Sequence, residues 1–279
     1  MLKLHRINNE AVKPVHFHDV VLDKRPVAGA DIFPEIYANI FICAKKKSGK
    51  TCAIAHIIEQ CATTETKVIA FVSTLNRDAT WRAIEKRCKD RNIDFTGFTS
   101  IHEGKEDILQ AITTSLNHKI EGKEEPSEIT QRGMGIVLND DDEPRNKKKK
   151  IPKHQAPEII FIFDDLSAEL KSPSITDLVK QNRHYKCKVI LSSQYWNDMD
   201  IKARLQMQYV MLYKGLSKQV NKLEDIYKNC SLSIEFELFV HLYRECSREQ
   251  YHFMYIDTAQ STFRKDFTHA IVIPKELEE

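Results

Sequence analysis

The sequence predicts an α/β fold in which a mostly parallel sheet lies between layers of helices. Apolar runs of about 5 to 8 residues alternate with longer stretches of helical periodicity, which is typical of strands joined by crossover helices. Several runs, such as NIFICA and EIIFIF, are apolar at consecutive positions, as strands buried on both faces require. Together these patterns indicate a three-layer sandwich.

The elements follow one another in a regular order. We expect strands at the apolar runs and helices where apolar residues recur at helical spacing. The last two helices form a small helical element that is appended to the core. The expected strands cover residues 39–44, 67–73, 95–101, 158–163, 188–193, 209–213 and 252–256. The expected helices cover residues 50–61, 78–91, 105–119, 174–183, 219–229 and 234–246.

Composition divides the chain into three parts. Residues 1–38 form an N-terminal strand or arm, residues 39–215 form the core, and residues 216–279 hold the C-terminal helices and a final strand packed on the core. The core is interrupted at 121–154, where apolar residues are few and an acidic block precedes a run of lysines. Segments of this composition bury too little apolar surface to fold on their own. We therefore expect a flexible charged insertion there.

Charge, cysteine content and hydropathy argue against several classes of protein. The 42 Lys and Arg residues nearly balance the 40 Asp and Glu residues, so the chain is neither a basic nucleic-acid coat nor an acidic tail protein. Seven cysteines form no C-x-x-C pair, which favours a reducing, intracellular compartment over a disulfide framework or a zinc ribbon. No apolar run approaches the roughly 18 residues of a membrane span, so we expect no membrane insertion. His16 and His18 lack partners at metal-ligand spacing, and we expect surface histidines there.

A candidate phosphate loop follows the first expected strand. The sequence A-K-K-K-S-G-K-T runs directly into a helical pattern, and N–H groups at the start of such a helix hold phosphate oxygens. Lys50 would neutralise the β- and γ-phosphates, and the Thr51 hydroxyl would bind Mg²⁺. Ala44 stands where the first glycine is usual, so we expect it to adopt a turn that glycine usually makes. The phosphate-binding residues are Ala44, Lys45, Lys46, Lys47, Ser48, Gly49, Lys50 and Thr51.

Two adjacent carboxylates follow a second buried strand, in the sequence E-I-I-F-I-F-D-D-L. Carboxylates are costly to place after five consecutive apolar residues unless a cation or a reaction uses them. We assign Asp164 to Mg²⁺ and Asp165 to polarising the attacking water.

A polar residue, Gln194, follows the strand K-V-I-L-S-S. Open α/β sheets bind ligands along the edge where their parallel strands end. We expect Gln194 to contact the γ-phosphate or to orient water, with a solvated loop glutamine as the alternative.

The order of these motifs resembles that of a known family. The phosphate loop, then F-I-F-D-D-L, then Q-N-R-H-Y-K-C-K-V-I-L-S-S-Q-Y are similar to the DNA-packaging ATPases of poxviruses, other large DNA viruses and virophages, a branch of the FtsK-HerA superfamily. The resemblance covers about residues 39–214 and is loose from Leu216 onward. It implies a P-loop NTPase core of the RecA or FtsK-HerA type.

The resemblance also implies a function. Such proteins are rings, hexamers or pentamers, that hydrolyse ATP with Mg²⁺ to drive double-stranded DNA into a preformed capsid at its portal vertex. The protein would act at the virus assembly site in the host cell, in the cytoplasm, or be associated with the virion. By position, Lys50 and Thr51 take the phosphate and magnesium roles, Asp164 the magnesium role, Asp165 the water-activating role and Gln194 the sensor role.

Arg183 matches the residue that, in related motors, reaches the neighbouring subunit's nucleotide as an arginine finger. A guanidinium added in this way stabilises charge on the transferring phosphoryl group and raises turnover by roughly 10³ to 10⁵. Arg204, on a short predicted helix, is a second candidate, with a solvated helix charge as the alternative. Asp165 departs from the family, because many members carry Glu there, and the shorter carboxylate needs a water or a shifted backbone to reach the nucleophile.

Two other functions stay open. One is a nucleotide or small-molecule kinase, which would need an arginine-rich lid over two substrates. The other is an assembly or scaffold protein that binds ATP without translocating DNA. For the motor, one hypothesis is that Lys147–Lys150 and Lys153 lie on a flexible loop that faces the DNA channel; the simpler interpretation, which we favour, is a surface insertion without DNA contact.

Overall fold

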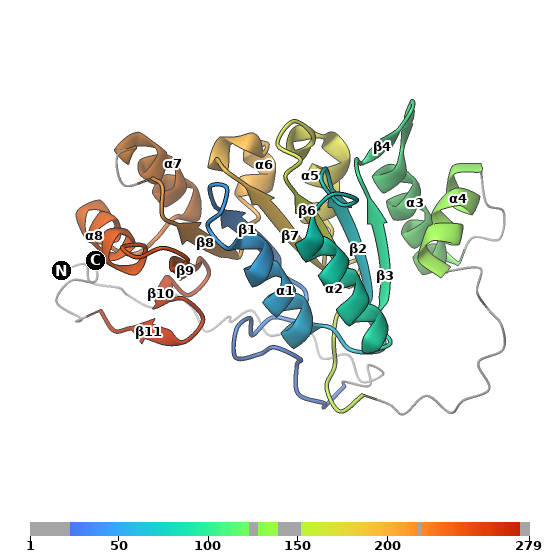
Figure 1. Cartoon of the computed structure of the whole chain (residues 1–279), viewed down its shortest axis with the longest axis horizontal. Coiled ribbons are helices and arrows are strands. Elements are labelled where there is room, and N and C mark those ends of the chain that lie inside the picture. Colours follow the sequence, from blue (N-terminus) through green and yellow to red (C-terminus); the bar gives the residue numbers. More distant parts are fainter. Residues whose placement is uncertain (1–22, 123–127, 139–151, 217–218, 274–279) are drawn as a thin grey trace, which may run out of the picture.

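The computed structural model describes residues 23–122, 128–138, 152–216 and 219–273. Over these residues the chain forms one nine-stranded sheet with helices on both faces, which confirms the expected α/β class (Figure 1). The strands of the sheet are β1 (Asn39–Cys43), β2 (Lys67–Val72), β3 (Asp94–Phe98), β6 (Ile159–Asp164), β7 (Cys187–Ser193), β8 (Tyr209–Tyr213), β9 (Phe253–Asp257), β10 (Thr262–Lys265) and β11 (His269–Ile271). A separate hairpin joins β4 (His102–Glu103) to β5 (Glu106–Asp107).

The helices fall close to their expected positions, with several additions. The α-helices are α1 (Lys50–Cys61), α2 (Ala79–Asp90), α3 (Ile108–Glu121), α4 (Glu128–Leu138), α5 (Pro173–Lys180), α6 (Ile201–Arg204), α7 (Val220–Cys230) and α8 (Phe236–Cys246). Two 3₁₀ turns are η1 (Glu169–Lys171) and η2 (Trp196–Asp198).

The strand order places three functional segments side by side. Along the sheet the order is β11-β10-β9-β8-β1-β7-β6-β2-β3. The strands from β8 to β3 are parallel, so they all end at one edge of the sheet, which we call the carboxyl edge; the opposite edge is the amino edge. Because β7 lies between β1 and β6, the segments that follow these three strands are neighbours at the carboxyl edge.

Alternating strand residues enter two separate apolar cores. Phe41 faces the layer formed by α3 and α5 to α8, whereas Ile40 and Ile42 face α1 and α2. Burial on both faces explains why the central strands are apolar at consecutive positions. In α1, Ala53, Ile54, Ile57 and Ile58 recur at the spacing of one helix face and pack in the core on this side of the sheet.

One helix lies in the segment expected as a flexible insertion. Helix α4 packs on α3, and the approach is so close that a Cβ at Gly133 would collide with the carbonyl oxygen of Ala111. The side chain of Arg132 pairs with Glu103 and Glu106 of the small hairpin. Residues 139–151, which include Lys147–Lys150, lie outside the described residues.

The C-terminal part of the chain differs in detail from expectation, whereas most of the expected N-terminal strand or arm falls outside the described residues. Instead of one final strand there are three, β9 to β11, which pair antiparallel beyond β8. Residues 23–38 contain no strand, and a single bridge joins Val27 to Gln155. His16 and His18 fall outside the described part. No helix in the described ranges has the length and apolar character that crossing a bilayer requires.

Candidate functional site

The loop between β1 and α1 makes its sharp turns at Lys47 and Gly49. Both residues have left-handed backbones, with φ of 63° and 93°. Ala44 does not adopt a positive φ; its N–H donates to the carbonyl of Ser193 at 2.9 Å and so continues the pairing of β1 with β7. An alanine is therefore compatible with the first position of this loop, because the glycine-like conformation falls elsewhere.

Lys50 joins the phosphate loop to both predicted carboxylates. Its ammonium lies 3.0 Å from Asp164 Oδ1 and also pairs with Asp165. The residue is only 8% exposed. Burial acts to lower the pKa of Lys50, but the negative charges of Asp164 and Asp165 outweigh it and hold the pKa above its ordinary value. The ammonium thus stays charged where the phosphates of a nucleotide would bind.

Asp164, the last residue of β6, is held by groups from two other elements. It is 2% exposed, accepts a hydrogen bond from Ser192 Oγ at 2.7 Å and accepts another from Trp81 Nε1 at 3.2 Å. Ser192 lies directly opposite Asp164 on β7. These bonds fix the carboxylate in one orientation. Neither partner was predicted as part of the site; the paired polar residues that end the apolar run K-V-I-L were the available signal for Ser192, and no local pattern marks Trp81.

Asp165 follows at the start of the turn after β6. Its φ is 56°, a left-handed conformation that aspartate tolerates better than most residues do. The turn directs its half-exposed carboxylate toward Lys50.

Gln194 follows β7 at the carboxyl edge, between the phosphate loop and Asp164. The residue is half-buried, and its carbonyl accepts a hydrogen bond from Cys43 Sγ at 3.5 Å. Next to it, Ser193 Oγ contacts Asp198 and lies 3.2 Å from Ser167 Oγ. The end of β7 is therefore connected by side chains to the turn that carries Asp165.

The two candidate arginines do not join this cluster. Arg183 precedes β7 and so lies at the amino edge, where its side chain is 69% exposed and its Nη2 is 3.0 Å from Glu35 Oε2. Arg204 ends α6, and its Nε donates to the carbonyl of Met199 at 3.0 Å. The structure thus brings together Lys50, Asp164, Asp165 and the segment of Gln194, and places Arg183 away from them.

The site offers few metal ligands of its own. Over the described ranges, no group of three or more His, Cys, Asp or Glu residues could hold a metal ion. Mg²⁺ usually binds through one or two protein oxygens together with substrate phosphates. The buried, oriented carboxylate of Asp164 and the hydroxyl of Thr51, in the first turn of α1, fit that kind of site.

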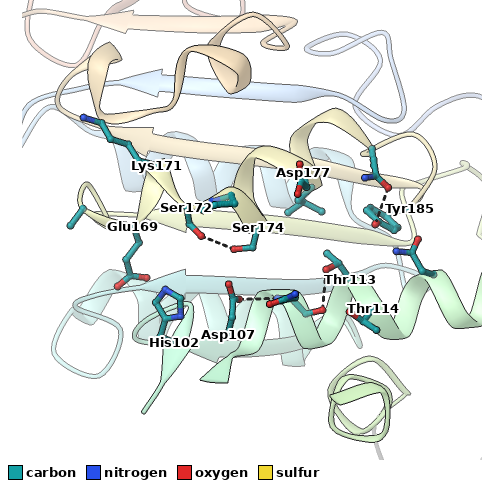
Figure 2. A pocket seen from close by; sticks show the side chains of 16 residues that line it. His102, Asp107, Thr113, Thr114, Glu169, Lys171, Ser172, Ser174, Asp177 and Tyr185 are labelled. Carbon is teal, nitrogen blue, oxygen red and sulfur yellow. Dashed lines mark hydrogen bonds between the residues drawn. The ribbon is translucent and has the colours of Figure 1, made fainter. Parts of the chain in front are cut away.

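A polar groove of about 750 Å³ lies between α3 and the segment formed by η1 and α5 (Figure 2). Its walls include Asp107, Glu169, Asp177 and Tyr185, and Ser172 and Ser174 hydrogen-bond to each other at 2.8 Å along its rim. None of the predicted site residues lines it. The groove is therefore a separate feature from the phosphate site.

A strand that leads through a lysine-containing loop into a helix, with an oriented carboxylate at the end of a nearby buried strand, defines a P-loop NTPase. The family model described as "Poxvirus A32 protein" matches residues 138–268, just under half of the chain. The predicted resemblance to the poxvirus DNA-packaging ATPases is confirmed over these residues, which include Asp164, Asp165 and Gln194.

Solved structures with a similar arrangement include the genome packaging NTPase B204 from Sulfolobus turreted icosahedral virus 2. Its complex with AMP has a TM-score of 0.47 at 14% identity, over 85% of this chain and 98% of that chain. Its complex with ATP-gammaS has a TM-score of 0.46 at 13% identity, over 86% and 100%. The cytoplasmic domain of the Thermomonospora curvata Type VII secretion ATPase EccC has a TM-score of 0.39 at 13% identity, over 69% of this chain and 22% of that chain. Among curated proteins, the chain has no match.

Proposed function

We propose that this protein is a viral genome-packaging ATPase, which hydrolyses ATP to move double-stranded DNA into a capsid. The observation that carries the proposal is the buried cluster in which Lys50 contacts both Asp164 and Asp165. Lys50 is paired with both carboxylates at the end of the phosphate loop. If a bound triphosphate pairs with Lys50 instead, Asp164 and Asp165 are freed for other contacts. The match to the poxvirus family supports the choice of packaging among the many functions of P-loop proteins.

The residues of the site divide the chemistry among them. Lys50 and the N–H groups of the loop bind the β- and γ-phosphates. Asp165 accepts a hydrogen bond from the attacking water and orients it, and Gln194 orients the same water or contacts the γ-phosphate. Mg²⁺, held by Thr51 and Asp164, would neutralise charge that develops on the phosphates during transfer.

The proposal includes a ring of subunits, a hexamer or pentamer, in which Arg183 reaches the nucleotide of the neighbouring subunit. Its position supports this role, because the exposed guanidinium lies at the amino edge and cannot serve the site of its own chain. Arg204 is a weaker candidate, since its guanidinium is bonded to its own backbone. The DNA substrate, the capsid or portal partner and an assembly site in the host cell follow from the packaging function.

Measurement of ATP turnover with and without long double-stranded DNA tests the proposal. We expect turnover that rises with DNA length and with protein concentration, and that disappears in Lys50→Ala. Turnover stimulated by a small acceptor instead of DNA would indicate the kinase alternative. ATP binding with no turnover under any of these conditions would indicate the scaffold alternative.

A further inference from the structure

Tyr251 lies beside the phosphate loop although it is about 200 residues away in sequence. It occupies the turn between α8 and β9, and because Phe253 pairs with Tyr213 antiparallel, this turn is at the carboxyl edge (Figure 1). A Cβ placed on Gly49 would lie 3.3 Å from Cδ1 of Tyr251. The tyrosine ring therefore touches the loop just before Lys50.

Core packing does not explain the conformation of Tyr251. The residue is 62% exposed, yet its φ is 71°, in the left-handed region that bulky residues seldom occupy. Such strain persists only where the surrounding structure imposes it, and it is concentrated at binding and catalytic sites.

The neighbours of Tyr251 hold the turn in place. Asp266, between β10 and β11, accepts a hydrogen bond from the N–H of Phe253 at 3.0 Å. Its other carboxylate oxygen lies 2.6 Å from Nδ1 of His252. Two bonds from one carboxylate thus fix the residues that follow Tyr251 and keep its ring against Gly49.

We propose that Tyr251 stacks on the base of the bound nucleotide. This inference rests on the proposed function, and it adds the part of the site that recognises the base. With the phosphates at the start of α1, the base must lie outside the loop, and Tyr251 presents an exposed aromatic face at the loop itself. Stacking accepts every base because each has a π face, so the ring favours nucleotides over inorganic phosphates without selecting ATP over GTP.

A second exposed aromatic at the carboxyl edge is less suited to the role. Tyr195 follows Gln194, but Lys222 Nζ lies 3.8 Å from the centre of its ring and covers one face. It also lies on the β7 side of the loop, whereas Tyr251 contacts Gly49 directly. Tyr195 is therefore a suitable control for Tyr251, because it is another exposed tyrosine at the carboxyl edge.

Equilibrium titrations of the full chain with ATP, GTP and inorganic tripolyphosphate test the inference. We expect Tyr251→Gly to weaken the binding of ATP and GTP about tenfold or more and to leave tripolyphosphate binding unchanged. Glycine is the informative replacement because it adopts a φ of 71° without strain. Tyr251→Phe keeps the ring and should bind all three ligands as the wild type does, and Tyr195→Ala should do the same.

Three results would overturn the inference. In the first, Tyr251→Gly binds ATP as tightly as the wild type. In the second, its affinity falls equally for ATP and for tripolyphosphate, which would mean that the ring acts on the shape of the phosphate loop. In the third, its affinity for ATP is unchanged but its affinity for double-stranded DNA falls, which would mean that the ring contacts DNA. A wild-type protein that binds no ATP at all would contradict the proposed function itself, which distinguishes the two failures.

Discussion

The two edges of the sheet carry charged groups in opposite ways. At the carboxyl edge, Lys50 and Asp164 are buried and every contact is to another buried or half-buried group. At the amino edge, Arg183 projects from the surface and makes one ion pair, to Glu35. Strand β7 separates them, and its seven residues span roughly 20 Å. An arginine at that distance cannot act in the site of its own chain, so a site that uses Arg183 is complete only between two subunits.

The largest expected effect is that of removing Arg183, and it tests whether the arginine of the amino edge acts only on a neighbouring subunit. We expect Arg183→Ala to lower DNA-stimulated ATP turnover by roughly 10³ to 10⁵, because the developing charge on the transferring phosphoryl group loses its external cation. Equilibrium ATP binding should be unchanged, since Arg183 lies far from its own phosphate loop. Steady-state turnover and nucleotide titration check the two statements separately.

A mixing experiment distinguishes action within a chain from action between chains. In a mixed ring of Lys50→Ala and Arg183→Ala subunits, an intact phosphate site can face an intact arginine. We expect partial recovery of turnover in the mixture. If mixed rings form and remain as inactive as each variant alone, Arg183 does not act across the interface.

At the carboxyl edge, the expected effect is smaller and concerns positioning. Ser192→Ala removes the hydrogen bond that orients Asp164, and loss of such supporting bonds typically lowers metal affinity or activity 10- to 100-fold. We expect the Mg²⁺ concentration that gives half-maximal turnover to rise. Ser193→Ala is the matched control, because its hydroxyl contacts Ser167 and Asp198 but not Asp164. Equal Mg²⁺ dependence in the two variants would contradict the assignment.

The amino edge contains one buried charge that contrasts with its exposed arginine. Lys188, on β7, has no exposed surface, donates to the carbonyl of Glu35 at 2.8 Å and lies over the ring of Phe33. Burial lowers the pKa of Lys188. As the pH rises through this lowered pKa, the folded state loses the proton before the unfolded state does, so folding gains stability between that pKa and 10.5.

Lys188→Met removes this titration. We expect the wild type to gain stability relative to Lys188→Met as the pH is raised from the lowered pKa of Lys188 toward 10.5. Denaturant unfolding of both proteins across the alkaline range measures the difference. A difference in the free energy of unfolding that stays constant with pH would show that Lys188 is not a buried, destabilised cation.

The smallest effect is expected for the ion pair between Glu35 and Arg183. Exposed pairs contribute about 0 to 1 kcal/mol, so Glu35→Gln should change the free energy of unfolding by no more than that. Turnover should be close to that of the wild type, because the guanidinium remains available to a neighbour. Glu35 Oε2 also accepts a hydrogen bond from Gln208 Nε2, so Arg183→Ala is the control. A large loss of stability in both variants would mean that Arg183 has a structural role at this edge, which would weaken the contrast between the edges.

Much of the carboxyl edge could be predicted from the sequence because its signals are local. The strand, loop and helix around Lys50 are consecutive, and Asp164 and Asp165 directly follow an apolar run. Strand ends of a parallel sheet meet at one edge, so the cluster followed from these short segments. The contacts of Lys50 with the two carboxylates agree with that expectation.

The contacts and elements that the sequence did not predict depend on pairings between distant segments. Trp81 reaches Asp164 because α2 packs on the sheet, and Tyr251 reaches Gly49 because β9 runs antiparallel to β8. The sequence of β9 does not indicate its direction, since burial produces the same apolar run in both cases. Helix α4 was missed for a similar reason: it is held by its packing on α3 through Gly133 rather than by a long apolar pattern of its own.

Because Trp81 is hydrogen-bonded to Asp164, its intrinsic fluorescence can report on changes at the site. The chain has two tryptophans, and Trp196 is buried with its indole N–H bonded to Asn229 at 2.8 Å. Replacing Trp196 by phenylalanine leaves a single tryptophan, whose indole nitrogen lies 3.2 Å from a carboxylate oxygen of Asp164. Any event that changes the charge at that carboxylate alters the field across the indole, so the fluorescence of Trp81 can follow each turnover without an added label.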